Sequence, residues 1–259
     1  MFSVEREACF MSLSRRDLLN AAVVATAVTT LPASGLLSSA AHAIPKAPDP
    51  KQLRASIQRL VERNERVLTG QTSRNGWEME RVADDHGHVY TRPVPGTPLD
   101  GIQVRMGPVE TLLVHVLRRF HYEIDELRKG DVVGWRAPSE VRKGLAESNQ
   151  ASGTAVQVRP GFYPLGSRGG FFPFQLAVIR DILAELEGLV RWGGDEPRPD
   201  EALFFIDVRP GNVRLIETAE RIRALSNTPG EGAGSSIDVS SPERRRAAET
   251  MERLQRSAL

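Results

Sequence analysis

The residue types that most often carry out chemistry are sparse in this chain, and their spacing mostly favours structural roles. His86 and His88 follow two aspartates and could form a metal loop, but the run Asp-Asp-His-Gly-His is more simply an exposed turn. His115 and His121 are six residues apart, which on a helix separates them by about 240° around the axis. The two side chains therefore cannot both bind one metal ion. We expect His121 to have a structural role, either in packing or as a hydrogen-bonding partner.

Nucleophilic catalysis is only weakly indicated. Ser148 and Ser152 lie close together, but the sequence places no histidine to activate either hydroxyl, so a serine hydrolase is disfavoured. No glycine-rich phosphate loop fits between a strand and a helix. The informative pattern is the segment around the two serines.

That segment reads Ser148-Asn149-Gln150-Ala151-Ser152-Gly153-Thr154-Ala155-Val156-Gln157. It resembles the Ser-x-His-x-x-Gly-x-Ala-x-Asp signature of zinc D-alanyl-D-alanine carboxypeptidases of the Hedgehog-like peptidase fold. The Ser, Gly and Ala are kept, but the two zinc-binding positions read Gln150 and Gln157. Downstream, residues 192–195 and 201–207 resemble the family's second block, in which a His supplies the third zinc ligand. In this chain Leu203 occupies the position of that His.

The side-chain chemistry of these three residues argues against zinc binding. Catalytic zinc needs three ligands drawn from imidazole, thiolate or carboxylate, and a fourth position for the water that it activates. Gln offers a neutral amide oxygen, which suits calcium better than zinc, and Leu offers no donor. Phe205 also replaces the polar residue that the family uses as a general base. The resemblance therefore implies a cell-wall peptidase scaffold without its metal, and we expect no cofactor.

The resemblance also implies where a peptide would bind. In the family, a basic residue upstream of the first block and the block's Ser hold the substrate's terminal carboxylate, and an Arg fork suits that role. In this chain, Arg136 or Arg142 together with Ser148 would hold the carboxylate. The alternative is that both arginines lie on a solvated loop and bind no ligand. The glutamines would face the same cleft and bond to peptide amides. The candidate peptide-binding residues are Arg136, Arg142, Ser148, Gln150, Gln157, Trp192 and Asp195.

The N-terminal residues indicate export. Arg15-Arg16 leads into the apolar, small-residue stretch from Leu18 to Leu37 and then into Ala41-His42-Ala43, which is typical of a twin-arginine secretion signal and its cleavage site. A membrane anchor is the alternative, but Pro32 and several threonines make the stretch weakly hydrophobic. We expect a secreted or cell-envelope protein with no stable membrane span after processing. The only cysteine, Cys9, would be removed, which excludes disulfides and cysteine metal sites.

Hydrophobic periodicity predicts an α+β domain, a small antiparallel sheet flanked by helices, which is also what the resemblance implies. We expect helices at 51–69, from 108 to about 127 and from about 173, and strands at 89–91, 132–135, 154–158, 190–192 and 203–208. The predicted organisation is a signal at 1–43, a spacer and amphipathic helix at 44–74, the carboxypeptidase-like domain at 75–227, and a Gly/Ser linker with a short charged helix at 228–259. We expect that tail to be flexible and solvated rather than docked on anionic wall polymer, because acidic residues offset its arginines.

Three functions remain open. The net charge is +1, so the overall electrostatic field of the chain does not favour binding to nucleic acid. The favoured function is an exported, non-catalytic homologue of the carboxypeptidases, a pseudoenzyme that binds peptidoglycan stem peptide or a cell-envelope protein. The second is an active metallopeptidase with a rearranged metal site built from Asp195, Asp200 or Asp207, whose oxygens favour calcium or magnesium. The third is a structural or regulatory exported protein whose fold is incidental to its function.

Overall fold

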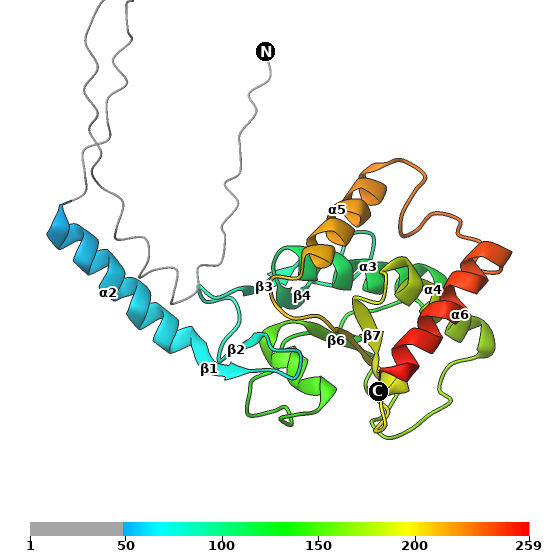
Figure 1. Cartoon of the computed structure of the whole chain (residues 1–259), viewed down its shortest axis with the longest axis horizontal. Coiled ribbons are helices and arrows are strands. Elements are labelled where there is room, and N and C mark those ends of the chain that lie inside the picture. Colours follow the sequence, from blue (N-terminus) through cyan, green and yellow to red (C-terminus); the bar gives the residue numbers. More distant parts are fainter. Residues whose placement is uncertain (1–48, 259) are drawn as a thin grey trace, which may run out of the picture. The chain divides into compact units, whose positions relative to one another are not determined.

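A computed structural model describes residues 49–258, and Figure 1 shows the arrangement of their elements. The predicted secretion signal at 1–43 lies outside the described residues. The helices are α2 (Pro50–Val67), α3 (Pro108–Glu123), α4 (Pro173–Glu185), α5 (Val213–Asn227) and α6 (Pro242–Ser257), with 3-10 helices η1 (Ala146–Ser152) and η2 (Gly193–Asp195). The strands are β1 (Leu68–Thr72), β2 (Glu78–Glu80), β3 (Val89–Arg92), β4 (Ile102–Arg105), β5 (Val132–Val133), β6 (Ala155–Val158), β7 (Val190–Trp192) and β8 (Leu203–Ile206).

The central sheet has four antiparallel strands in the order β5-β6-β8-β7. Two smaller antiparallel pairs, β1 with β2 and β3 with β4, complete the strands of the described residues. β6 and β8 are buried along their whole length, because they are the inner strands and both of their faces are covered. The prediction of a mixed α+β domain with small antiparallel sheets is therefore confirmed.

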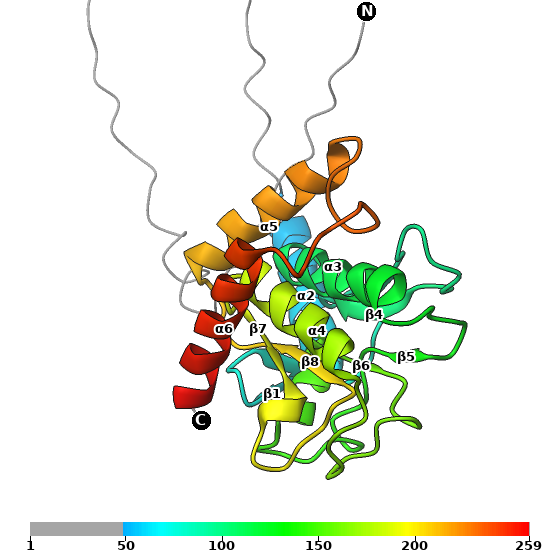
Figure 2. The same cartoon turned by 90° about the vertical axis from the view of Figure 1, so that its right-hand side faces the viewer.

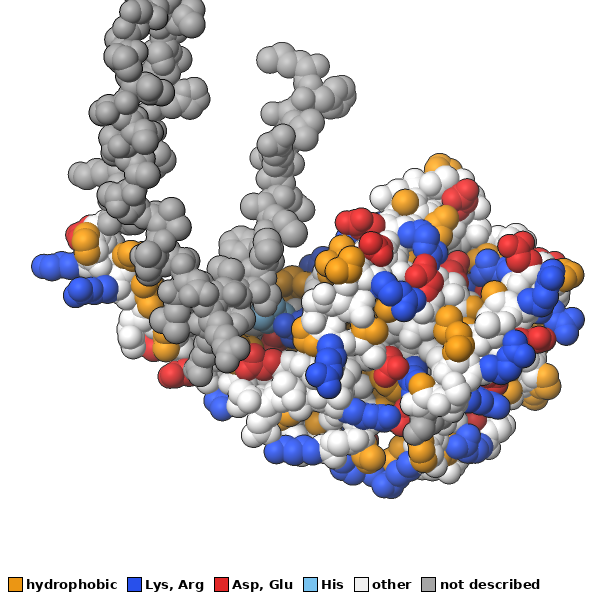
Figure 3. Space-filling model, viewed as in Figure 1, with side chains coloured by type: hydrophobic (Ala, Val, Ile, Leu, Met, Phe, Trp, Pro, Cys, Tyr) orange, Lys and Arg blue, Asp and Glu red, His pale blue; other side chains and the backbone are white. Residues whose placement is uncertain are grey.

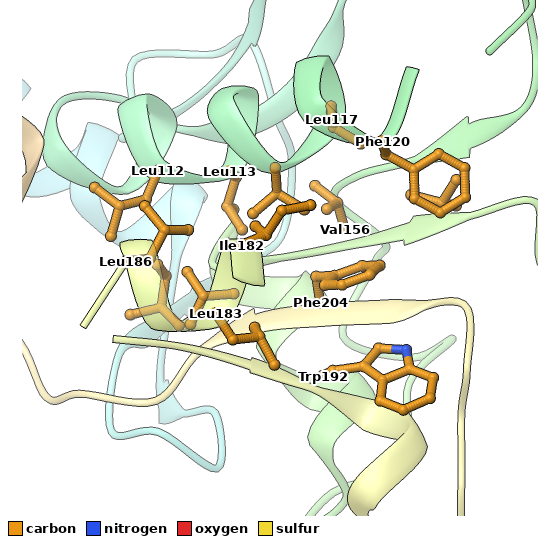
Figure 4. Close-up of a cluster of buried hydrophobic side chains, with 14 of the residues drawn as sticks. Leu112, Leu113, Leu117, Phe120, Val156, Ile182, Leu183, Leu186, Trp192 and Phe204 are labelled. Atoms are coloured by element: carbon orange, nitrogen blue, oxygen red, sulfur yellow. The ribbon is translucent and has the colours of Figure 1, made fainter. Parts of the chain in front are cut away.

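The main core lies between one face of this sheet and the helices α3 and α4. Figure 4 shows Leu112 and Leu113 of α3 facing Ile182 and Leu183 of α4, with Phe204 of β8 beneath them. All five side chains are at most 1% exposed. Because each contributes roughly 1.5–3 kcal/mol on burial, this layer holds the helices on the sheet.

Helix α3 begins as the sequence predicts and ends earlier. Pro108 opens its first turn, where the missing N–H costs nothing, and the Glu110 carboxylate accepts the N–H of Gly107 at 3.3 Å. The helix ends at Glu123 rather than near Leu127, because the Nδ1 atom of His121 accepts the N–H of Leu127 at 2.9 Å and fixes the chain after the turn.

A cluster of buried charges joins α3 to α4. Arg119 is 0% exposed and donates from Nη1 to Asp181 and to Glu185, both at 2.8 Å. Its other guanidinium nitrogens bond to Glu123, one turn further along α3. A buried charge is tolerated only when it is paired in this way.

The C-terminal tail packs on the domain, so the prediction of a solvated tail is wrong. α6 lies beside α4 (Figure 2), and Arg244 bonds with two nitrogens to the Asp181 carboxylate at 2.6 and 2.7 Å. Near the other end of α6, the Gln255 amide donates to the carbonyl of Val190 at 2.8 Å. Val239, in the predicted linker, is a member of the main core.

Helix α2 keeps its apolar side chains exposed. Leu53, Ile57, Leu60 and Val61 are 44–54% exposed, and hydrophobic side chains are visible on α2 in Figure 3. The predicted amphipathic helix is therefore present, ending at Val67 rather than at residue 69. None of the described helices is both long enough and apolar enough to cross a bilayer.

Candidate functional site

The segment that resembles the peptidase signature forms η1 followed by β6. η1 ends at Gly153, whose φ of 68° lies in the left-handed region that glycine adopts without strain. A Cβ at this position would lie 2.7 Å from the backbone nitrogen of Arg105. Glycine is therefore the residue that lets the chain turn from η1 into β6 at this close approach.

The face of the sheet turned away from α3 and α4 carries the positions of interest, and we call it the site face. Successive side chains of a strand point to opposite faces. The register pairs of β6 and β8 on this face are Ala155 with Phe205 and Gln157 with Leu203. Ala146 of η1 joins Ala155, Leu203 and Phe205 in a small apolar cluster, so η1 covers part of this face.

The three positions that the resemblance assigns to a metal lie on the site face or beside it. Gln157 pairs in register with Leu203 on β8 and with Val133 on β5. The Nε2 atom of Gln150 donates to the carbonyl of Gly134 at 2.9 Å and to that of Val133 at 3.3 Å. Positions that are far apart in the sequence thus lie around one end of β6.

The side chains at these positions do not fit zinc. Leu203 has no donor atom and packs in the apolar cluster. The amide nitrogen of Gln157 donates to the Oδ2 atom of Asp200 at 2.7 Å. The Oε1 atom of Gln150 is buried without a hydrogen bond, but a neutral amide oxygen alone is a poor zinc ligand. Among residues 49–258, no group of three or more His, Cys, Asp or Glu side chains could hold a metal ion.

The three aspartates considered for a rearranged metal site stand apart. Both oxygens of Asp195 bond to Arg180, and Asp207 lies 2.8 Å from the Nε atom of Arg191. Asp200 bonds to Gln157 on the site face instead. Each aspartate lines a different cavity, so they do not converge on one ion.

A cavity of about 320 Å³ opens beside Leu203, and we call it the Leu203 cavity. Its charged lining residues are Arg74, Glu147, Glu196, Arg198 and Asp200. The Oε1 atom of Glu196 and the Oδ1 atom of Asp200 are buried and have no hydrogen-bond partner. A buried acceptor without a partner costs free energy, so a ligand that donates hydrogen bonds would be stabilised here.

The carboxyl groups of this cavity titrate differently. Burial raises the pKa of Asp200, and the negative charge of Glu147 adds to that effect. The pKa of Glu147 is lowered because hydrogen bonds from Arg142 stabilise its charged form. Asp200 therefore keeps its proton to a higher pH than an ordinary aspartate, whereas Glu147 stays ionised.

The arginines predicted to hold a substrate carboxylate are paired with acids of the protein. Arg142 donates from Nε and Nη2 to the two oxygens of Glu147, at 2.6 and 2.7 Å. The Nε atom of Arg136 lies 3.9 Å from Glu140. Neither arginine lines the Leu203 cavity. A carboxylate at Arg142 would have to displace Glu147, so the structure gives this arginine a structural partner.

Ser148 is also engaged by the protein. Its hydroxyl donates to the carbonyl of Leu145 at 2.7 Å and accepts the N–H of Arg74 at 3.1 Å, and the residue is 1% exposed. Ser152 bonds to Ser73 and to neighbouring polar groups of the same loop. Neither hydroxyl bonds to a histidine, which is what the sequence indicated.

Trp192 and Asp195 do not belong to the Leu203 cavity. They line a separate cavity of about 450 Å³ between α4, α6 and η2. The indole N–H of Trp192 donates to the carbonyl of Glu201 at 2.8 Å, and the Arg180 guanidinium lies 5.1 Å from the ring centre. Trp192 and Asp195 are close to Leu203 in the sequence, but they line a different cavity.

The histidines have the structural roles that their spacing favoured. His86 is exposed in the loop before β3, and the Nδ1 atom of His88 lies 3.1 Å from Glu80. His115 lies 2.8 Å from Glu185 through Nε2. His121 accepts a backbone hydrogen bond, as predicted.

Sequence reasoning missed Arg74, which the loop after β1 positions at the site. The Nδ2 atom of Asn75 donates to the carbonyl of Ile206 and to the hydroxyl of Thr154, both at 2.8 Å. The indole N–H of Trp77 donates to the carbonyl of Val208 at 2.7 Å. These bonds fasten the loop to the end of β8. The triplet Asn75-Gly76-Trp77 was a visible signal, because its polar and aromatic side chains had no place in a regular element.

Comparison with family models, with curated proteins and with solved structures found no match to this chain. The resemblance to carboxypeptidases therefore rests on the sequence motifs given above.

Proposed function

We propose that this chain is an exported, non-catalytic homologue of peptidoglycan D-Ala-D-Ala carboxypeptidases that binds the wall's stem peptide in the Leu203 cavity. One observation carries the proposal. The three positions that hold zinc in the family converge on the site face as Gln150, Gln157 and Leu203, while a cavity with unpartnered polar atoms remains beside them. A peptidase that lost its metal and kept its binding cleft would have this combination.

The chemistry of the cavity suits a peptide. Backbone amides donate hydrogen bonds, which the free oxygens of Glu196 and Asp200 accept. Arg198 is exposed at the cavity and is available to peptide carbonyls or carboxylates. The volume of about 320 Å³ is at the lower end of the range for small-ligand sites, enough for a short peptide end.

The proposal includes the compartment. The twin-arginine pattern within residues 1–43 would deliver the folded chain to the cell envelope, where stem peptides are found. A cell-envelope protein is the other partner that this location allows. An active metallopeptidase with a rearranged site is less well supported, because arginines hold Asp195 and Asp207.

Calorimetric titration tests peptide binding. The peptide L-Ala-γ-D-Glu-L-Lys-D-Ala-D-Ala is titrated into the full chain and into the variants Arg198→Glu and Arg246→Glu. Arg198→Glu should weaken binding about three- to tenfold, the range for reversing one exposed charge near a ligand. Arg246 is exposed on α6 and lines none of the three cavities, so Arg246→Glu should bind like the unaltered chain. No heat of binding up to millimolar peptide would refute the proposal.

A further inference from the structure

A second, smaller cavity follows the Leu203 cavity along the site face. It has a volume of about 150 Å³ and is lined by Arg74, Asn75, Asn149, Phe205, Asp207 and Arg209. We call it the Asn149 cavity. Arg74 lines both cavities, so the two meet at this residue.

The Asn149 cavity holds a buried donor that the protein leaves free. Asn149 is 0% exposed, and its Oδ1 atom accepts the N–H of Asn75 at 3.1 Å. Its Nδ2 atom is buried and has no hydrogen-bond partner. Buried amide donors are nearly always paired in proteins, so this atom indicates an acceptor that the protein itself does not supply.

Two arginines converge on the same cavity. The Arg74 guanidinium lies 5.9 Å from the centre of the Phe205 ring, and one of its nitrogens bonds to Glu196 at 2.5 Å. The side chain of Arg209 runs beside Gly76, where a Cβ would be 3.6 Å from its Cγ atom. An arginine offers five N–H donors, so Arg74 keeps others for a ligand after pairing with Glu196.

The carboxylate in this cavity already has a partner. Asp207 lies 2.8 Å from the Nε atom of Arg191, which balances its charge. Burial raises the pKa of Asp207, whereas the charges of Arg191 and Arg74 act in the opposite direction. Counting these neighbours, three arginines (Arg74, Arg191 and Arg209) face the carboxylates of Glu196 and Asp207, which leaves the cavity with a positive excess.

The spacing of the two cavities matches an extended peptide. Leu203 lines the first cavity, and Phe205 and Asp207 line the second. Alternate residues of a strand lie about 6.6 Å apart, so the cavities are about 7–13 Å apart along β8. An extended ligand of two to four residues has the same length, which lets one peptide occupy both.

We propose that the Asn149 cavity is a carboxylate subsite, in which Asn149 Nδ2, Arg74 and Arg209 bind the free carboxylate of the peptide that occupies the Leu203 cavity. The identity of the peptide rests on the proposed function, but the carboxylate chemistry does not. A singly charged, planar group suits one amide and two guanidinium donors in this small volume, whereas a phosphate dianion would bring a second negative charge towards Asp207. The subsite replaces the role predicted for Arg136, Arg142 and Ser148, which are paired elsewhere.

Two titrations of the full chain test the subsite. Acetate is followed by the amide and guanidinium signals in nitrogen-15 NMR spectra, and phosphate is titrated for comparison. The stem pentapeptide is compared with its C-terminal amide by calorimetry. We expect saturable acetate shifts at the Asn149 side chain, with phosphate binding more weakly, and peptide amide binding about tenfold weaker than the free acid.

Arg209→Gln is the informative variant, because Arg209 is exposed and its loss leaves the core intact. It should weaken acetate binding at least fivefold, whereas the control Arg246→Gln, at an exposed position that lines neither cavity, should leave acetate binding unchanged. Equal binding of peptide acid and amide, acetate that shifts no signal at Asn149, or phosphate binding tighter than acetate would each overturn the subsite. If neither peptide binds while acetate does, the proposed function fails and the subsite stands.

Discussion

Glu185 provides the strongest electrostatic test of how α3 and α4 are held together. Its Oε2 atom accepts a hydrogen bond from Arg119 and lies 2.8 Å from the Nε2 atom of His115. Burial on its own would raise the pKa of Glu185, but the hydrogen bond from His115 and the charges of His115 and Arg119 outweigh it and lower the pKa to about 2. The side chain is only 13% exposed, so solvent screens these interactions little.

The magnitude follows from the shift. The pKa falls from 4.5 to about 2, and each unit corresponds to about 1.4 kcal/mol, so the charged form of Glu185 stabilises the folded state by roughly 3 kcal/mol. Because the folded pKa is the lower one, this stability is fully present above pH 4.5 and is lost as the pH falls to 2. Glu185→Gln should therefore cost about 3 kcal/mol at pH 7, and the difference from the unaltered chain should shrink between pH 4.5 and pH 2.

Urea unfolding, followed by tryptophan fluorescence at a series of pH values, measures this difference. Glu187→Gln is the matched control, because Glu187 is 45% exposed and its pairs with Arg214 and Arg221 lie at the surface. It should cost less than about 1 kcal/mol at any pH. If Glu185→Gln costs no more than this control, or if its cost does not change below pH 4.5, the account of the buried charge cluster is wrong.

Two further predictions concern the tail and the site. Arg244→Ala removes the two hydrogen bonds from Arg244 to Asp181 of α4 and should destabilise the docked tail by about 1–2 kcal/mol. We expect the amides of α6 to exchange hydrogen about tenfold faster, with exchange in the other helices unchanged. Unchanged exchange in α6 would show that other contacts hold this helix. The triple variant Gln150→His, Gln157→Asp, Leu203→His restores the donor types of a zinc site on the site face and should bind one zinc ion by calorimetry. It should release little D-alanine, because Phe205 still replaces the general base, and failure to bind zinc would contradict the resemblance.

Elements with strong local signals could be predicted from the sequence. α3 carries apolar residues at helical spacing after a proline, and β8 is a continuous apolar run, so periodicity and length settle both. α5 was missed although Leu215, Ala219 and Ile222 recur at helical spacing and are buried. The sequence did not predict β1, β2 and β4, because each strand is short and its pairing partner cannot be recognised from the local sequence.

The pairing of charged side chains could not be predicted, because it depends on contacts between distant residues. Arg244 is one of three consecutive arginines, and nothing local shows that Asp181 of α4 binds it. Arg142 is a plausible carboxylate binder by type, but the fold gives it Glu147. For the same reason the convergence of Arg74 and Arg209 on one cavity emerged only from the structure.

The loss of metal chemistry is the central claim, and zinc titration followed by a D-alanine release assay in the same sample tests it most directly. Zinc is titrated into the metal-free full chain, and the stem pentapeptide is then added. Our account predicts no one-to-one binding at micromolar zinc and no D-alanine release above the zinc-only blank. Tight one-to-one binding with release would show that other residues form a working site and that the chain is a peptidase.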